Sequence, residues 1–258
     1  MSQPALLDLF RLDGKVAIVT GASSGLGVAF AEGLAEAGAD IAICARRVDR
    51  LEETKGRVEA LGRRCVAVEA DVSKPEDCTR VVERAVAELG RVDVLVNNAG
   101  VGTAVPATRE QPDEFRKVID INLNGSYFMA QAAARAMSGN GGGSIVNIGS
   151  VLGSTTAGLP QAAYAASKAA ILGLTRDLAQ QWTGRKGIRV NALAPGFFAS
   201  EMTDQYPDGY LDQMKWRIPA GRTGDPRELT AALLFLASDA SSYVTGALLP
   251  VDGGMLTT

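Results

Sequence analysis

Short apolar runs alternate with longer amphipathic segments along most of the chain. Runs rich in Val, Ile and Ala, too short to be helices, predict strands at residues 15–20, 41–45, 66–70, 92–96, 144–148, 188–194 and 247–251. The segments between them predict helices at residues 28–37, 49–61, 75–89, about 111–136, about 161–182 and 226–237. Residues 197–225, rich in Pro, Gly and Met, show no clear period.

This alternation predicts an α/β fold, a doubly wound and mostly parallel sheet with helices on both faces. We expect an N-terminal extension over residues 1–13, one ligand-binding and catalytic domain over residues 14–258, and a substrate lid at about residues 197–225. Ligands of such sheets bind at the carboxyl ends of the strands. The residues that follow the strands are therefore the candidates for function.

Composition and charge narrow the possible partners. The net charge of −3 offers no basic surface of the kind that attracts nucleic acid or an anionic membrane. The first 13 residues lack the pattern of a signal peptide, and no apolar run is long enough to cross a bilayer. Cys44, Cys65 and Cys78 have no CxxC spacing, and we expect reduced, buried thiols in a cytoplasmic protein.

The chain contains no histidine. This absence excludes Ser-His-Asp hydrolysis, Cys-His proteolysis and histidine-bound catalytic zinc, and we expect no metal site. Proton transfer must then use Tyr, Lys, Asp, Glu or a cofactor.

A glycine-rich loop follows the first predicted strand. Gly21, Gly25 and Gly27 are spaced differently from the GxGxxG fingerprint, with three residues between the first two glycines. Glycines at this position let backbone N–H groups and a helix N-terminus approach a pyrophosphate. A purely structural turn is the alternative, but the position between strand and helix favours a dinucleotide site that also includes Ser23, Ser24 and Leu26.

The ends of the second and third strands bear on which dinucleotide binds. The second strand is followed by Arg46 and Arg47, with no acidic residue, and an arginine suits the 2′-phosphate of NADP(H). We therefore favour NADP(H) over NAD(H), with Arg46 as the more direct contact; two solvated arginines are the alternative. Asp71 either binds the adenine amino group or only caps a turn, and we place Val72 beside it in the cofactor site.

Tyr164 and Lys168 lie four residues apart in a predicted helix, on one face. A neighbouring ammonium favours the phenolate, and a phenol of lowered pKa can exchange a proton at neutral pH. Alone, the spacing is common on solvated helices.

Several motifs in order resemble the short-chain dehydrogenase/reductase family. They are the segment from Thr20 to Gly27, Asn97-Asn98-Ala99-Gly100, Ser150, Tyr164-xxx-Lys168, Pro195-Gly196 and Val251-Asp252-Gly253-Gly254. The resemblance covers all but about the first dozen residues. It implies a single Rossmann-like domain, a nicotinamide cofactor and a homotetramer or homodimer.

The resemblance also implies residue roles. Tyr164 is the general acid/base, Lys168 lowers its pKa and holds the nicotinamide ribose, Ser150 orients the substrate carbonyl, and Asn122 links the lysine to a water chain. The remaining cofactor contacts that we assign are Asn98, Ala99, Gly100, Pro195, Gly196, Phe198 and Ser200. Ser200 stands where the family more often has threonine; it keeps the hydroxyl.

The predicted activity is the interconversion of a carbonyl and a secondary alcohol by hydride transfer. Substrate choice is expected to depend on residues 101–108, 151–160 and 197–217. The apolar side chains of the lid either cover the substrate or pack on protein; they are Phe197, Phe198, Met202, Tyr206, Tyr210, Met214 and Trp216. The pattern is similar both to 3-oxoacyl reductases and to sugar-acid dehydrogenases such as gluconate 5-dehydrogenase. A redox-neutral epimerase or dehydratase and a non-catalytic dinucleotide sensor are further alternatives.

Overall fold

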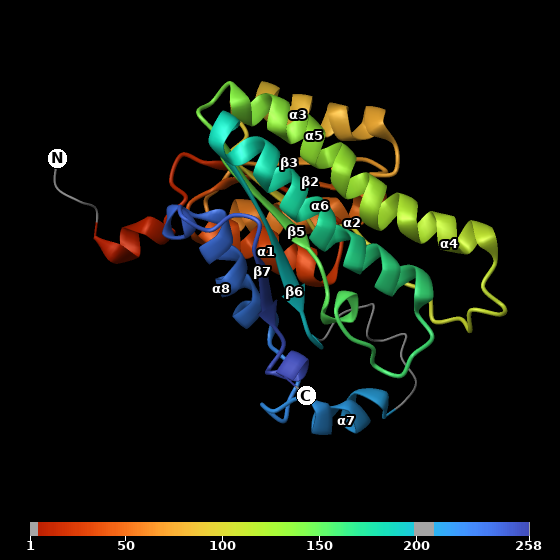
Figure 1. The fold of residues 1–258 in the computed structure, drawn as a ribbon. Helices are drawn as coiled ribbons and strands as arrows, with labels where there is room; N and C mark the ends of the chain where they lie inside the picture. The colour runs from red at the N-terminus through yellow and green to blue at the C-terminus, as the bar shows by residue number, and fades with distance from the viewer. Residues whose placement is uncertain (1–4, 199–208, 258) are drawn as a thin grey trace.

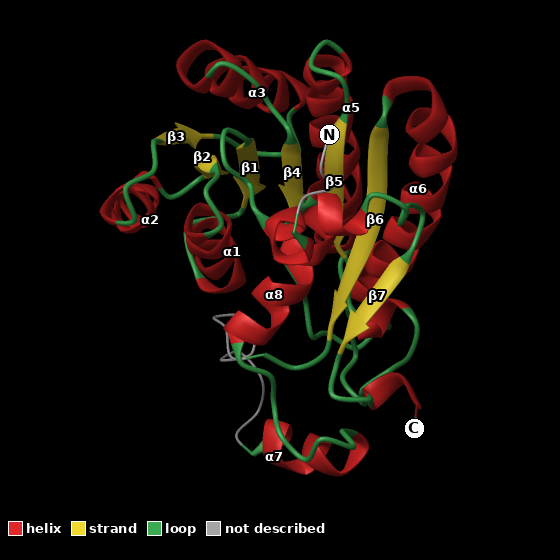
Figure 2. Ribbon diagram, turned by 90° about the vertical axis from the view of Figure 1, so that its left-hand side faces the viewer, coloured by secondary structure: helices red, strands yellow, loops and turns green. Residues whose placement is uncertain are grey.

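The computed structural model describes residues 5–198 and 209–257. Seven parallel strands form one sheet in the order β3-β2-β1-β4-β5-β6-β7, visible across Figure 2. The strands are β1 Val16–Thr20, β2 Asp40–Ala45, β3 Cys65–Glu69, β4 Val94–Asn97, β5 Gly143–Ile148, β6 Ile188–Pro195 and β7 Leu248–Val251. The predicted doubly wound parallel sheet is confirmed.

Helices cover both faces of the sheet (Figures 1 and 2). Those described are α1 Gly25–Glu36, α2 Val48–Ala60, α3 Pro75–Leu89, α4 Pro112–Ile119, α5 Gly125–Ser138, α6 Ala162–Lys186, α7 Tyr210–Met214 and α8 Pro226–Ala237. On β1, Val16 and Ile18 join the core beneath α3, α5 and α6, whereas Ala17 and Val19 join the core beneath α1, α2 and α8. This alternation, with both sets buried, is the pattern of a strand covered on two sides.

The strand order changes direction between β1 and β4, which pair directly. Chain segments leaving the two strands diverge to opposite halves of the sheet, and a crevice opens at their carboxyl ends. The fold therefore brings the glycine loop after β1 next to the Asn98-Ala99-Gly100 segment after β4.

Three local differences from the predicted elements affect the site. Helix α1 begins at Gly25, three residues before the predicted start, so two of the loop glycines belong to its first turn. The helical region predicted at residues 111–136 is divided into α4 and α5 by a π-helical turn, Asp120–Asn124. Helix α6 continues to Lys186, four residues beyond the predicted end.

The two ends of the chain are tied to the core in different ways. Residues 6–10 form a short 3-10 helix whose Phe10 ring lies 6.4 Å from that of Phe235, and Leu12 is buried. Near the other end, Met255 is fully buried among residues close to Tyr164. No helix within residues 5–198 and 209–257 has the length and apolar character needed to span a membrane.

Candidate active site

The glycine loop packs directly on the end of β4. A Cβ atom on Gly21 would lie 2.8 Å from the Ala99 Cα, and one on Gly27 would lie 2.3 Å from the Gly21 carbonyl oxygen. Gly21 also has φ of 67°, a left-handed conformation that side chains disfavour. Larger residues at these two positions would separate the loop from β4, so the glycines create a cradle of bare backbone at the start of α1.

Hydrogen bonds fix the position of this cradle. The Thr20 hydroxyl accepts from the backbone N–H groups of Asn98 and Ala99 at 3.0 and 2.9 Å. The Asn98 side-chain amide donates to the carbonyl oxygens of Thr20 and Gly21 at 2.9 and 3.3 Å. The ends of β1 and β4 thus form one rigid unit.

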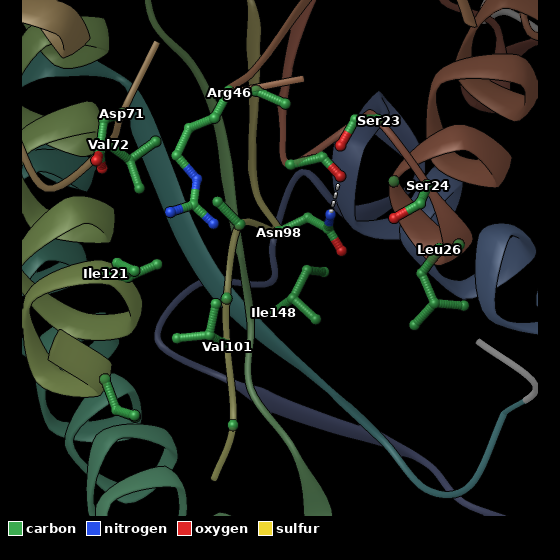
Figure 3. A pocket seen from close by; sticks show the side chains of 18 of the residues that line it. Ser23, Ser24, Leu26, Arg46, Asp71, Val72, Asn98, Val101, Ile121 and Ile148 are labelled. Carbon is green, nitrogen blue, oxygen red and sulfur yellow. Dashed lines mark hydrogen bonds between the residues drawn. The ribbon is translucent and has the colours of Figure 1, made fainter. Parts of the chain in front are cut away.

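A cleft of about 680 Å³ runs along the carboxyl ends of the strands (Figure 3). Most of the predicted cofactor residues line it, and these are Gly21, Ser23, Ser24, Gly25, Leu26, Gly27, Arg46, Arg47, Asp71, Val72, Asn98, Ala99, Gly100, Tyr164 and Lys168. An open cleft with a bare backbone cradle at a helix N-terminus fits a dinucleotide with its pyrophosphate on the cradle.

Four predicted cofactor contacts behave differently. Pro195 and Gly196, at the end of β6, are not among the residues that line the cleft. The Phe198 ring is buried in the core beneath α1 and α8, packed against Gly224. Ser200, like the lid residues Met202 and Tyr206, lies outside the described residues.

The two arginines after β2 have different surroundings. The Arg47 guanidinium donates to the Ser23 and Ser24 hydroxyls, at 2.7 Å for Ser24, and so braces the glycine loop. Arg46 is exposed, and its guanidinium reaches into the cleft between Asp71 and Ser23 (Figure 3). Among the described residues no carboxylate pairs with Arg46, so the cation is available to an anionic ligand.

Asp71 performs the turn-capping role that the sequence left open. Its carboxylate accepts from the Ser73 backbone N–H at 3.1 Å and from the Ser73 hydroxyl at 2.7 Å. The same residue borders the cleft beside Val72. The capped turn holds both side chains at the cleft wall.

Tyr164 and Lys168 line the cleft from the first turns of α6. The Lys168 ammonium lies 5.6 Å from the centre of the Tyr164 ring and donates to the Ile148 carbonyl oxygen at 2.7 Å. Burial lowers the pKa of Lys168 to about 8. A cation beside the phenol stabilises its ionised form, so the pair can exchange a proton with a ligand in the cleft.

Asn122 sits in the π-helical turn and connects three elements. Its side-chain amide donates to the Val101 carbonyl oxygen and the Ser167 hydroxyl, both at 2.9 Å, and its carbonyl oxygen accepts from the Val101 N–H at 2.8 Å. A Cβ atom on Gly100 would lie 3.3 Å from that side-chain oxygen and 3.6 Å from the Lys168 ammonium. Asn122 and the Lys168 ammonium therefore both lie against Gly100, and Asn122 fixes the loop that follows β4; its link to a water chain stays a prediction.

A ladder of buried polar groups supports the π-helical turn. The Ser126 hydroxyl donates to the Asn122 carbonyl oxygen at 2.7 Å, and the Asn97 amide donates to the Ser126 carbonyl oxygen at 2.9 Å. The Asn97 amide also donates to Asn147, whose own amide donates to Thr175. Two backbone carbonyl groups at the π-helical turn thus accept side-chain hydrogen bonds, and the Asn97 amide connects the turn through β4 to β5 and α6.

Ser150 follows β5 directly. It is buried, and its hydroxyl accepts from the Leu152 N–H at 3.1 Å, capping the short 3-10 helix Val151–Gly153. Beyond it, a third apolar cluster surrounds Tyr164 and joins the loop after β5 to the region of α7. Its buried members are Val151, Leu152, Ala157, Tyr164, Phe197, Tyr210, Met214, Ile218 and Met255.

The lid side chains divide into two groups. Phe197, Tyr210 and Met214 are buried in this third cluster, and the Tyr210 hydroxyl donates to the Ala157 carbonyl oxygen at 2.5 Å. Trp216 is 80% exposed. Among the described lid residues, Phe197, Phe198, Tyr210 and Met214 thus pack against the protein.

Several residues that line the cleft were not assigned from the sequence. On the α4 side these are Glu114, Lys117, Val118 and Ile121, at the helical spacing i, i+3, i+4 and i+7. The spacing itself was visible in the sequence, but nothing there showed that this face borders the cleft. Within the described ranges, no group of three potential metal-ligating side chains is found.

Comparisons with known proteins show the family to which the chain belongs. The family profile described as "Enoyl-(Acyl carrier protein) reductase" matches residues 21–256. A 2-dehydro-3-deoxy-D-gluconate 5-dehydrogenase of Dickeya dadantii is 42% identical over 254 residues, which cover 97% of this chain and 99% of that protein. A 3-oxoacyl-(acyl-carrier-protein) reductase of Thermotoga maritima is 40% identical over 247 residues, 95% of this chain and 99% of that one.

A solved structure has the same architecture. It is the gluconate 5-dehydrogenase of Burkholderia cenocepacia in complex with NADP and tartrate, with a TM-score of 0.93 and 38% identity over 98% of this chain and 100% of that one. The matched range of the profile includes the glycine cradle, the π-helical asparagine, Ser150 and the Tyr164-Lys168 pair. The chain belongs to the short-chain dehydrogenase/reductase family of oxidoreductases.

Proposed function

We propose that this protein binds NADP(H) and interconverts a ketone and a secondary alcohol. The observation that carries the proposal is the buried Lys168 ammonium, 5.6 Å from the Tyr164 ring, in a cleft that the glycine cradle also lines. The cradle and the α1 N-terminus would hold the pyrophosphate, and Arg46 the 2′-phosphate. Bound there, the nicotinamide cofactor supplies the hydride for reduction or accepts it in the reverse reaction.

Side chains of the protein donate and accept the proton. In reduction, the Tyr164 hydroxyl gives its proton to the carbonyl oxygen as the carbon becomes tetrahedral, and the Lys168 cation stabilises the phenolate that remains. The Ser150 hydroxyl donates a hydrogen bond to the same oxygen and orients it. Asn122 holds the loop from Gly100 to Val101 against the lysine. In oxidation the phenolate takes the alcohol proton.

The apolar cluster around Tyr164 supports a ketone with an aliphatic part, and 3-oxoacyl reduction is the first substrate class that we propose. Val151, Leu152 and Phe197 offer hydrocarbon surface next to the proton donor. A sugar-acid or polyol dehydrogenase is the second class. It is supported by the names of the gluconate-type relatives and by the tartrate in the NADP-bound structure.

Oxidation of NADPH and NADH with a panel of carbonyls tests the proposal. The panel contains a 3-oxoacyl thioester, 5-ketogluconate and cyclic ketones. We expect NADPH to be preferred and a carbonyl to be reduced to the alcohol. A redox-neutral product by mass spectrometry would indicate an epimerase or dehydratase instead. Binding of NADPH without turnover of any carbonyl would favour a sensor, and absence of NADPH binding would overturn the proposal.

We also infer the wider organisation of the protein. Residues 14–258 act as one catalytic domain, with residues 1–13 as an extension and a substrate lid at about 197–225. Phe115 on α4 and Tyr127 on α5 are each 38% exposed, which supports a homotetramer or homodimer buried on this side. The three free, buried cysteines support a reducing cytoplasm. A monomer by light scattering would contradict the assembly.

A further inference from the structure

Ser167 is a fully buried serine between the two α6 residues that carry the proton chemistry. It follows Tyr164 by one helical turn, directly precedes Lys168, and has an exposed fraction of 0%. A buried hydroxyl needs partners, and in a helix it commonly donates to a backbone carbonyl of the preceding turn. The Ser167 hydroxyl does so, donating to the Tyr164 carbonyl oxygen at 2.7 Å. This bond alone would make it an ordinary helix serine.

A second hydrogen bond connects Ser167 to another element. Its hydroxyl oxygen accepts from the Asn122 side-chain amide at 2.9 Å. A hydroxyl has one proton, which here points to the Tyr164 carbonyl, so its lone pairs are free to accept from the amide N–H. The bond joins the first turns of α6 to the π-helical turn Asp120–Asn124.

Asn122 continues the connection to the loop after β4. Its amide binds both backbone groups of Val101, accepting from the N–H at 2.8 Å and donating to the carbonyl oxygen at 2.9 Å. The next residue, Gly102, runs beside the tyrosine, since a Cβ atom on it would lie 3.4 Å from the Tyr164 ring. The contacts therefore form a closed circuit, from the Tyr164 backbone through Ser167, Asn122 and the loop back to the Tyr164 ring.

This circuit constrains the proton donor from both ends. The helix holds the backbone of Tyr164, but the ring turns on its side-chain bonds and needs a fixed wall beside it. The loop is that wall, and without the Ser167 hydroxyl the Asn122 turn loses the side-chain hydrogen bond that joins it to α6. A displacement of about 1 Å between reacting groups can lower a rate about 100-fold.

We propose that Ser167 is a positioning residue for proton transfer: its hydroxyl holds the Asn122 turn and the loop after β4 against α6, and so keeps the Tyr164 hydroxyl aligned with the substrate carbonyl. The inference rests on the proposed carbonyl reduction and deepens it. Ser167 is not among the described residues that line the cleft, so it acts through its neighbours. Its loss should slow proton transfer without weakening the binding of either ligand.

The test is Ser167→Ala, which removes the hydroxyl and little else. It uses NADPH and the ketone of the panel that the wild-type protein reduces fastest. We expect kcat to fall about tenfold, with the ketone KM and the NADPH dissociation constant within about twofold of the wild-type values. The solvent deuterium isotope effect on kcat should increase, because transfer of the Tyr164 proton becomes slower. A serine that only stabilised the fold would leave this isotope effect unchanged.

Ser241→Ala is the matched control. Ser241 is also 0% exposed, and its hydroxyl likewise donates to a backbone carbonyl, that of Leu236 at 3.0 Å, and accepts from a side chain, that of Arg189 at 2.7 Å. Arg189 stands at the amino end of β6, on the opposite edge of the sheet from the cleft. Ser241→Ala should lower the thermal midpoint, as Ser167→Ala does, but leave kcat and the isotope effect at their wild-type values.

If Ser167→Ala fails to fold, Ser167→Cys is compared with Ser241→Cys in the same way. A thiol is a weaker donor and acceptor than a hydroxyl, so the same loss of kcat is expected to a smaller degree. A wild-type kcat in the Ser167 variant, a loss that the Ser241 variant shares, or a loss that follows weaker NADPH binding overturns the inference alone. If the wild-type protein reduces no carbonyl in the panel, the proposed function is wrong and the inference with it.

Discussion

The two sides of Tyr164 differ in the groups that form them: backbone on the cofactor side and apolar side chains on the other. On the cofactor side, the cleft floor is backbone and glycine, fixed by Thr20 and Asn98 to two adjacent strands. On the other side, side chains from the loop after β5, the α7 region and the chain end meet in one apolar cluster. Backbone groups can bind a cofactor that all members of a family share. A substrate that differs between members must be recognised by side chains.

This comparison makes Tyr164 the residue where both sides meet, and its substitution should have the largest effect. Tyr164→Phe removes the proton donor while keeping the ring beside Lys168. We expect kcat/KM for ketone reduction to fall about 10³-fold, because general acid catalysis contributes 10²- to 10⁴-fold. Stopped-flow or steady-state NADPH oxidation measures it.

The control for this substitution is Tyr127→Phe, at a tyrosine that is 38% exposed on α5. The control should retain activity, and NADPH affinity should be nearly unchanged in both variants. Turnover by Tyr164→Phe at the wild-type rate would mean that the proton comes from another group.

The next largest effect should be confined to the cofactor side. Arg46→Asp replaces a cation in the cleft by a carboxylate, which repels a 2′-phosphate and accepts a hydrogen bond from a ribose 2′-hydroxyl. We expect the ratio of kcat/KM for NADPH to that for NADH to fall about 100-fold. The preference between different ketones should stay the same.

Arg185→Ala provides a comparison for the loss of a positive charge, since Arg185 lies in the last turn of α6. It should alter neither ratio. If Arg46→Asp leaves the preference for NADPH unchanged, another cation must bind the 2′-phosphate. Arg47, which donates to the loop serines, would then be tested next.

The sequence predicted the two sides of the site unequally, and for a physical reason. Glycine spacing, the strand ends and the Tyr164-Lys168 pair follow from local rules of backbone conformation and helical periodicity, so these positions could be identified before the fold was known. The order of the strands then brought fifteen assigned positions to one cleft.

Features that depend on tertiary packing were missed. The π-helical turn at Asp120–Asn124 is held by Ser126 and Asn97 across the sheet, and no periodicity in its own residues signals it. The sequence likewise did not show that the Phe198 ring fills the core beneath α1; the assignment of this residue to the cofactor stays a prediction.

A pH effect should report on Lys168, between the two sides. Burial lowers its pKa to about 8, so the free enzyme loses this cation as the pH rises through that value. We expect kcat/KM for ketone reduction to decrease about tenfold per pH unit above about pH 8. Lys168→Arg keeps a positive charge to higher pH. Whatever activity this variant retains should therefore decrease only at a higher pH than in the wild type. A flat profile to pH 10 would exclude a requirement for the charged lysine.

The same group gives the stability of cofactor-free protein a pH dependence of known sign. The pKa of Lys168 is lower in the folded protein than its ordinary value of 10.5, so between about pH 8 and 10.5 the unfolded chain binds more protons. The free energy of unfolding contributed by Lys168 therefore rises with pH in this window. Burial raises the pKa of Cys44 to about 12, which has the opposite effect above pH 9. Denaturant titrations of wild type and Lys168→Met isolate the lysine as the difference.

The smallest effect should come from Gly102, which forms the border between the two sides. It lines the cofactor cleft, and a Cβ atom on it would lie 3.4 Å from the Tyr164 ring, an ordinary contact distance. Gly102→Ala should therefore change kcat/KM by about twofold or less. Gly102→Val adds two methyl groups against the ring and should weaken both NADPH binding and ketone reduction, because overpacking typically costs about 1–3 kcal/mol. Paired measurements of the NADPH dissociation constant and the ketone KM show whether Gly102→Val affects both ligands. If Gly102→Val weakened the binding of NADPH alone or of the ketone alone, Gly102 would not border both binding sites.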